Sequence, residues 1–115
     1  METLPARTGD DAGVIPKLMV VGVCRVTLHL PASHSLKDKR QVVRSLLARL
    51  QNRFHLSVAE VEDQDRWQIA TLGLVCVSSS ASIVDEVLTH ALDYIEDMRL
   101  DTMVTEVAKE ITHIL

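Results

Sequence analysis

The first clear pattern along the chain is an alternation that is typical of a β-strand. Between residues 18 and 30 the even-numbered positions carry small or apolar side chains: Val20, Gly22, Cys24, Val26, Leu28 and Leu30. The odd-numbered positions turn polar from Arg25 onward, so we expect the even-numbered residues to face the core. Pro31 follows and ends the strand.

Two longer segments have apolar residues at helical spacing. The first follows Ser35, which can cap a helix together with Asp38 three residues later. We expect this helix to end near Asn52 or Arg53, with the apolar stripe Leu36, Val43, Leu46, Leu47, Leu50 and Phe54. The second follows three serines at 78–80 and has the apolar stripe Val84, Val87, Leu88, Ala91, Leu92 and Ile95.

Three further segments are predicted to be strands. Residues 55–62 alternate, residues 63–66 form a turn, and residues 67–77 become apolar on both faces in their second half. Residues 103–115 are predicted to be the last strand, although two charged residues interrupt the alternation and the segment also has helical potential.

The order strand-helix-strand-strand-helix-strand is that of the ferredoxin-like α+β fold. We expect a four-stranded, mostly antiparallel sheet in the order 4-1-3-2, with both helices on one face. In this arrangement we expect the first and third strands to be adjacent and parallel, which would explain why both are apolar on both faces. Residues 1–17, with several Pro, Gly and Asp, are predicted to be a flexible N-terminal extension, and residues 18–115 the domain.

The odd-numbered apolar residues of the first and third strands then lie on the uncovered sheet face. Such a patch is typical of a contact with another surface. We expect an oligomer or partner interface there, formed by Met19, Val21, Val23, Trp67, Ile69, Val75 and Val77. The alternative is that the N-terminal extension folds across this face. Since Trp67 is its single aromatic residue, base stacking of the kind used by RNA-recognition motifs is not expected.

Charge and composition narrow the classes of function. The net charge of −4 argues against a surface that wraps nucleic acid, but it permits a local basic patch. Cys24 and Cys76 lie in apolar runs and are interpreted as buried free thiols of a reducing compartment. We find no apolar run of membrane-spanning length and no secretory signal, and therefore expect a cytoplasmic protein.

A basic segment opens the first helix, where free backbone N–H groups already favour anions. If the first and third strands are parallel, the loops that follow them leave the same end of the sheet. We therefore predict a candidate site for RNA or another anion at Ser33, His34, Ser35, Lys37, Lys39, Arg40, Arg44 and Ser79. The alternative is an ordinary solvated helix face.

Catalytic and metal chemistry have weaker support. The acidic cluster at Glu60, Glu62, Asp63 and Asp65 fits a hairpin turn better than acid–base chemistry or a divalent-ion site. The five histidines lack zinc-site spacing, no Gly-rich phosphate loop is present, and no hydroxyl or thiol has a recognisable activating base. We expect a protein that is not an enzyme and that uses no cofactor or metal.

Several segments resemble the YlxP-like family of bacterial proteins, a domain of unknown function numbered 503. The resemblance lies in residues 20–24, 29–31 and 33–40, including Ser-His-Ser-Leu-Lys, and continues through 52–54, 57–61 and the Asp-Arg-Trp-Gln run at 65–68. It covers about residues 18–115 and is loosest at 109–113. It implies a ferredoxin-like fold without established catalytic residues. Genes of the family often lie among those for transcription and translation factors, which implies association with RNA or the ribosome.

Three hypotheses follow. The leading one is a translation-associated module that contacts RNA or a ribosomal partner through Lys37, Lys39, Arg40 and Arg44. The second is a homo-oligomeric regulatory or scaffold domain that acts through its open sheet face. The third and weakest is an enzyme that acts on a phosphorylated small molecule at the helix N-termini.

Overall fold

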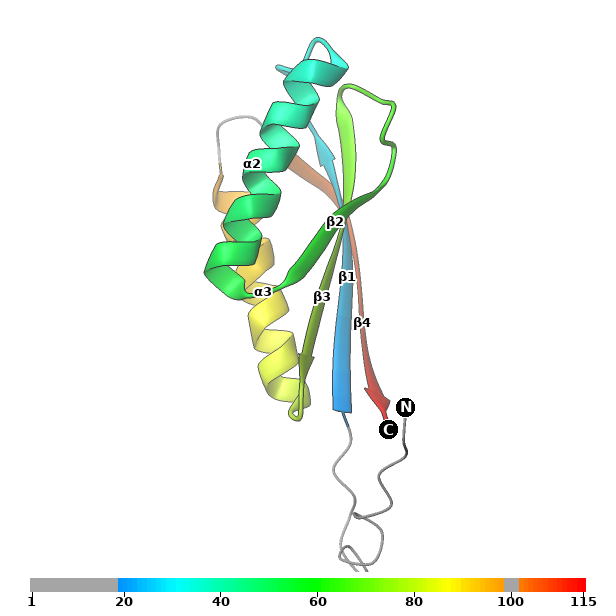
Figure 1. The fold of residues 1–115 in the computed structure, drawn as a ribbon, viewed down its shortest axis with the longest axis vertical. Coiled ribbons are helices and arrows are strands. Elements are labelled where there is room, and N and C mark those ends of the chain that lie inside the picture. The colour runs from blue at the N-terminus through cyan, green and yellow to red at the C-terminus, as the bar shows by residue number, and fades with distance from the viewer. Residues whose placement is uncertain (1–18, 99–101) are drawn as a thin grey trace, which may run out of the picture.

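The computed structural model describes residues 19–98 and 102–115 (Figure 1). The elements follow the predicted order: β1 (Met19–His29), α2 (Leu36–Phe54), β2 (Ser57–Glu62), β3 (Ile69–Ser78), α3 (Ala81–Asp97) and β4 (Met103–Ile114). The predicted N-terminal extension at 1–17 lies outside the described residues. Neither α2 nor α3 is long and apolar enough to cross a membrane.

The four strands form one open sheet in the order β2-β3-β1-β4, with every neighbouring pair antiparallel. The ferredoxin-like arrangement is confirmed, but the expectation that β1 and β3 are parallel is wrong, since Val20 pairs with Ser78 and His29 with Ile69. The cause is the connections. The α2 crossover makes β1 and β2 run in the same direction one strand apart, and the hairpin returns β3 antiparallel into the gap between them. The two-sided apolar pattern therefore reports a central position in the sheet and not a direction.

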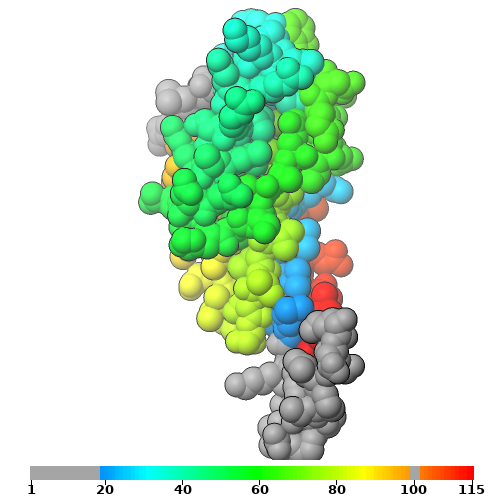
Figure 2. Space-filling model, viewed as in Figure 1, coloured from blue at the N-terminus to red at the C-terminus, as the bar shows by residue number. Residues whose placement is uncertain are grey.

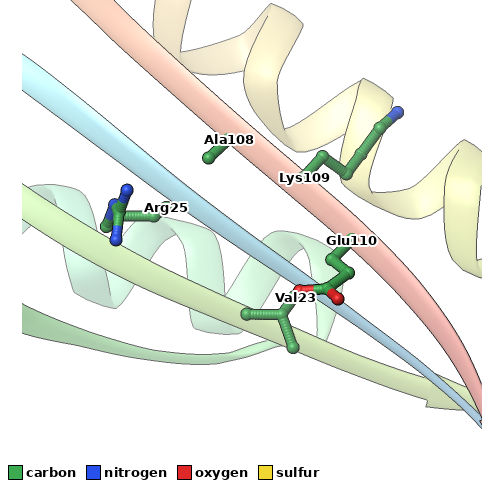
Figure 3. A pocket seen from close by; sticks show the side chains of 5 residues that line it. All are labelled: Val23, Arg25, Ala108, Lys109 and Glu110. Atoms are coloured by element: carbon green, nitrogen blue, oxygen red, sulfur yellow. The ribbon is translucent and has the colours of Figure 1, made fainter.

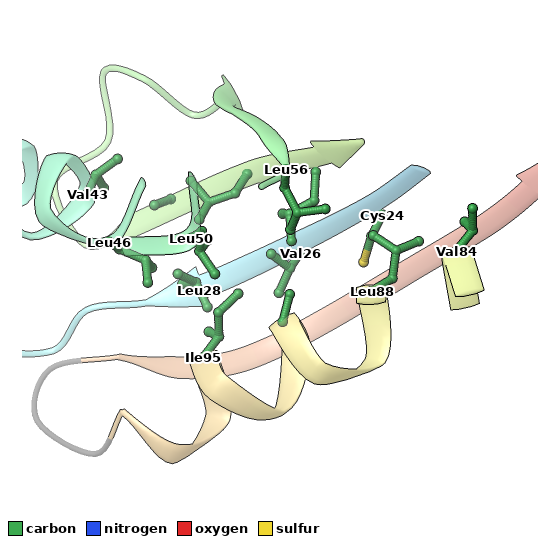
Figure 4. Packing of buried hydrophobic residues seen from close by; sticks show 14 of the residues in the cluster. Cys24, Val26, Leu28, Val43, Leu46, Leu50, Leu56, Val84, Leu88 and Ile95 are labelled. Atoms are coloured by element: carbon green, nitrogen blue, oxygen red, sulfur yellow. The ribbon is translucent and has the colours of Figure 1, made fainter. Parts of the chain in front are cut away.

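Both helices cover the same face of the sheet (Figure 1). The even-numbered residues of β1 point toward them, as predicted, and Cys24, Val26 and Leu28 are almost fully buried. Figure 4 shows these side chains between Leu46 and Leu50 of α2 and Leu88 of α3 and its neighbours. Aliphatic side chains thus fill the core.

Gly22 allows α3 to approach β1 closely. A Cβ atom at this position would lie 2.2 Å from Cγ1 of Val84 and 2.8 Å from Cδ1 of Leu88. These distances are too short for non-bonded carbon atoms. The position of α3 on the sheet therefore requires a glycine in the middle of β1.

Candidate binding surfaces

The start of α2 is capped by its own side chains. Ser35 Oγ accepts a hydrogen bond from the Asp38 amide at 3.0 Å, and the Asp38 carboxylate accepts one from the His34 amide at 3.0 Å. The predicted cap is confirmed, in a variant in which Asp38 reaches the residue before Ser35. Because Asp38 places a negative charge at the helix start and Ser35 Oγ already occupies one of its amides, this terminus is poorly suited to a second anion.

Lys39 is buried rather than presented to solvent, with a side-chain exposure of 1%. Its Nζ lies 2.7 Å from Glu60 Oε2 and donates to the carbonyl oxygens of Asp63 and Arg66. The ammonium group thus has two hydrogen-bond acceptors in the turn after β2 and an ion-pair partner on β2. Lys39 is therefore not presented for the predicted contact with RNA, because this side chain holds the β2–β3 hairpin against α2.

Ser33 and Ser79 also do not belong to an exposed anion site. Ser33 is buried; its hydroxyl donates to the Ser35 carbonyl at 3.2 Å, and its own carbonyl accepts from Gln68 Nε2 at 3.1 Å. Ser79 follows β3, whose last residue pairs with the beginning of β1, whereas α2 follows the end of β1. The two helix N-termini therefore lie at opposite ends of the sheet, and the predicted gathering of Ser79 with Ser33, His34 and Ser35 does not occur.

Segments that carry the family resemblance contact one another around the β2–β3 hairpin. Asp63 has a left-handed backbone with φ of 61° and its carboxylate accepts from Thr71 Oγ1 at 2.8 Å, while its carbonyl closes the turn to the Arg66 amide. Together with the bonds of Lys39 and Gln68, these contacts join three separate stretches of chain. The acidic cluster forms the hairpin turn and its approach, as predicted, and Glu60 has the added role of counterion to the buried Lys39.

The exposed surface of α2 keeps a cationic stripe. Lys37, Arg40 and Arg44 are exposed and lie within about 60° of one another around the helix axis, at about 100° per residue. Arg49 and Arg53 are exposed on another side of the same helix, and its single acid, Asp38, is used in the cap. Figure 2 shows this outer surface of α2 in cyan to green, open to the viewer.

The neighbouring helix has the opposite charge. α3 carries no Lys or Arg and five exposed acids: Asp85, Glu86, Asp93, Glu96 and Asp97. The overall charge of −4 therefore conceals a helix layer that is divided into a basic and an acidic half. A local basic surface is present despite an acidic total.

The basic flank of α2 that faces α3 already contacts an aromatic residue of that helix. The Arg53 guanidinium lies 5.1 Å from the Tyr94 ring centroid, and the Phe54 and Tyr94 rings meet edge to face at 5.6 Å. A hollow of about 320 Å³ opens beside them, where His90, Asp93 and Asp97 of α3 also line it. The cationic stripe on the other flank is thus the part of α2 left for a partner.

The uncovered sheet face carries an apolar patch at one end. Its members come from the start of β1 and the ends of β3 and β4: Met19, Val21, Val23, Val75, Val77 and Ile114. The register places Val21 beside Val77 and Val23 beside Val75. Five of the seven predicted interface residues are thus together.

The other two predicted interface residues lie elsewhere. Ile69 pairs with His29 at the far end of β3, and Trp67, which is half exposed, precedes that strand. Ile114, which pairs with Met19, belongs to the patch but was not predicted. The alternation along β4 predicts which of its side chains share a sheet face. Which residues of β1 lie beside them is known only from the register.

A shallow hollow lies next to the apolar patch. Arg25 is flanked by two very small residues, Gly73 on β3 and Ala108 on β4, and the hollow of about 290 Å³ is lined by Val23, Arg25, Ala108, Lys109 and Glu110. Figure 3 shows Glu110 beside Val23, with Lys109 pointing the other way. On the helix side Lys109 pairs with Asp85 at 2.6 Å.

Groups for catalysis or metal binding are sparse in the part of the chain that the structure describes. It contains no group of three His, Cys, Asp or Glu residues placed to hold a metal. Both thiols are free; Cys24 is buried, whereas Cys76 is only partly so. Burial raises the pKa of Cys24 and that of Cys76, which disfavours a thiolate nucleophile at neutral pH.

Comparison with known proteins identifies the family. The model of the family described as "Protein of unknown function (DUF503)" matches residues 21–109, most of the chain. This protein belongs to the DUF503 family. The uncharacterized protein YlxP of Bacillus subtilis (strain 168) is 40% identical over 62 residues, which span 54% of this chain and 67% of that protein. The predicted membership of the YlxP-like family is thereby confirmed.

Two solved structures are similar to this DUF503 chain at a low level. The de novo designed protein Foldit4 has a TM-score of 0.47 at 12% identity and covers 82% of this chain and 96% of its own. The structural-genomics protein YJCS has a TM-score of 0.46 at 12% identity, with coverage of 78% and 96%. At such values neither likeness bears on function.

Proposed function

We propose that this DUF503 protein is a non-enzymatic binding module that contacts RNA phosphate groups, in the setting of the ribosome or another translation component, through Lys37, Arg40 and Arg44. The division of charge between α2 and α3 carries this proposal. Cations that share one helix flank without exposed carboxylates attract a polyanion, whereas a uniformly mixed surface does not.

Two features at the start of α2 change the details of the hypothesis drawn from the sequence. Contact comes from a helix flank and not from a pocket at the helix start, because Asp38 fills that terminus and Lys39 is buried. An enzyme acting at two converging helix N-termini loses its geometric support, since these termini lie at opposite ends of the sheet. A flank contact reads phosphate and not sequence, so we expect little base specificity.

Binding to a structured ribosomal RNA fragment tests the proposal. Three phosphate contacts predict a log–log slope of affinity against salt of about −2 to −3 between about 50 and 200 mM salt. Replacing Arg40 and Arg44 by Glu should weaken binding and lower the magnitude of that slope by about 1.5 to 2. Co-sedimentation with ribosomal subunits gives the same comparison in a native setting.

Arg49→Glu is the matched control. It makes the same charge change on the same helix, about 140° around the axis from Arg44 at about 100° per residue, and should retain the slope. Equal loss in Arg49→Glu and in the Arg40/Arg44 variant would show a non-specific charge effect. Absence of any retention of the natural protein by RNA or ribosomes at low salt would end the proposal.

A further inference from the structure

Among the described residues, nothing covers the apolar patch on the open sheet face. Val77 is 60% exposed, Val23 43% and Met19 41%, although all three belong to strands in or next to the sheet centre. Contiguous apolar surface of this kind on a sheet is typical of a contact with a second surface. The apolar character of the patch and the charges beside it indicate the nature of that second surface.

The patch is bordered by two opposite charges. Arg25 lies two residues beyond Val23 on β1, and Glu110 lies directly across from Val23 on β4, so all three share the open face. The two charged residues do not form an ion pair with each other or with another described residue. The face therefore presents a cation and an anion next to the same valine, the cation along β1 and the anion across on β4.

A two-fold symmetric contact requires a surface that is complementary to itself. When two copies of this face meet about a two-fold axis that passes near Val23 and bisects the directions to Arg25 and Glu110, the cation of one copy comes opposite the anion of the other, twice per dimer. The remaining apolar side chains then pack on their equivalents, as they do between the layers of a β-sandwich. Charge and hydrophobicity thus both indicate that the partner of this face is a second copy of this chain.

We propose that this protein forms a face-to-face homodimer in which Arg25 pairs with Glu110 of the partner subunit, and Glu110 with Arg25 of the partner subunit, around the apolar patch. Sheets that pack in this way stand about 10 Å apart, which long Arg and Glu side chains can bridge. The helices remain on the outside, so each dimer presents two cationic stripes to solvent and the contact is independent of RNA.

A charge exchange tests the pairing. Sedimentation equilibrium of the full chain should give a dimer, with Arg25→Glu and Glu110→Arg each weakening association at least about tenfold because like charges then face each other twice. The double variant Arg25→Glu/Glu110→Arg should recover most of the affinity. Arg44→Glu, on the outer surface of α2, is the matched control and should dimerise normally.

Other occupants of the face give different results. If residues 1–18 or an unrelated protein cover it, the full chain stays monomeric even at about millimolar concentration, and the proposal is overturned. Unchanged dimerisation in both single variants would overturn it equally, because the interface would then lie elsewhere. Circular dichroism establishes folding; if either reversal unfolds, Val77→Lys serves instead, since a side chain that is 60% exposed tolerates the change and must still disrupt the dimer.

Discussion

The ammonium group of Lys39 lies 2.7 Å from a carboxylate oxygen of Glu60, and this pair joins the start of α2 to β2. The side chains are 1% and 19% exposed. A buried ion pair of this kind contributes little compared with a well-packed apolar pair, but loss of one partner leaves a charge without compensation.

We therefore expect Lys39→Met to lower the free energy of unfolding by about 3 kcal/mol. The substitution keeps an unbranched side chain of similar length but leaves Glu60 without its ion-pair partner and two carbonyl oxygens without their donor. Urea denaturation followed by circular dichroism measures the effect. Arg40→Met, one residue along and exposed, should stay within about 0.5 kcal/mol of the natural protein.

Removing both charges separates the ion pair from packing. The double variant Lys39→Met/Glu60→Gln should recover part of the lost stability, because no charge then remains buried. If the double variant were as unstable as the sum of the single variants, the two side chains would not interact energetically.

Gly22→Ala should be destabilising, although alanine is better suited to a strand than glycine. Its Cβ would meet Val84 and Leu88 at distances that force α3 away from β1, a type of overpacking that typically costs about 1–3 kcal/mol. Gly73→Ala is the matched control: there the nearest atom is Cγ1 of Val61 at 3.0 Å, on a half-exposed side chain that can move. Thermal melts of both variants give the comparison, and equal melting temperatures would contradict the close approach of α3.

Much of the fold could be predicted from the sequence because local patterns determine it. The even-numbered face of β1, the cap at Ser35 and the buried stripe of α3 all follow from side-chain periodicity. The relative direction of β1 and β3 does not, since an apolar pattern records burial on two faces and not chain direction. The connections give that direction: one helical crossover and one short hairpin.

Lys39 could have been recognised as buried. It is four residues before Val43 and belongs with Leu46 and Leu50 on the apolar side of α2, so a charge at that position indicates a buried partner. That Glu60 is the partner depends on tertiary packing. The association of Arg25 with Gly73 and Ala108 likewise depends on strand registers, which include a bulge between Thr27 and Leu28 that the sequence does not reveal.

The ion pair between Lys109 and Asp85 should contribute far less than the buried one, although its 2.6 Å separation is as short. Both side chains are partly exposed, at 32% and 52%, so water and salt screen the attraction. We expect Asp85→Asn to change the free energy of unfolding by less than about 1 kcal/mol, and the difference to vanish in about 1 M salt. A larger, salt-independent loss in urea denaturation would contradict this account.

Stability should decline at alkaline pH in a way that depends on Cys24. Burial raises the pKa of this thiol above its ordinary value of 9.0, and the positive charge of Lys109 offsets only part of that rise. Above pH 9 the unfolded chain loses the thiol proton while the folded chain keeps it, so stability is complete below about pH 9 and falls as pH rises further. Cys24→Ala, less stable at neutral pH because of the cavity, should lose less stability between about pH 8 and pH 10. Parallel pH profiles of the two proteins in urea denaturation would exclude this contribution.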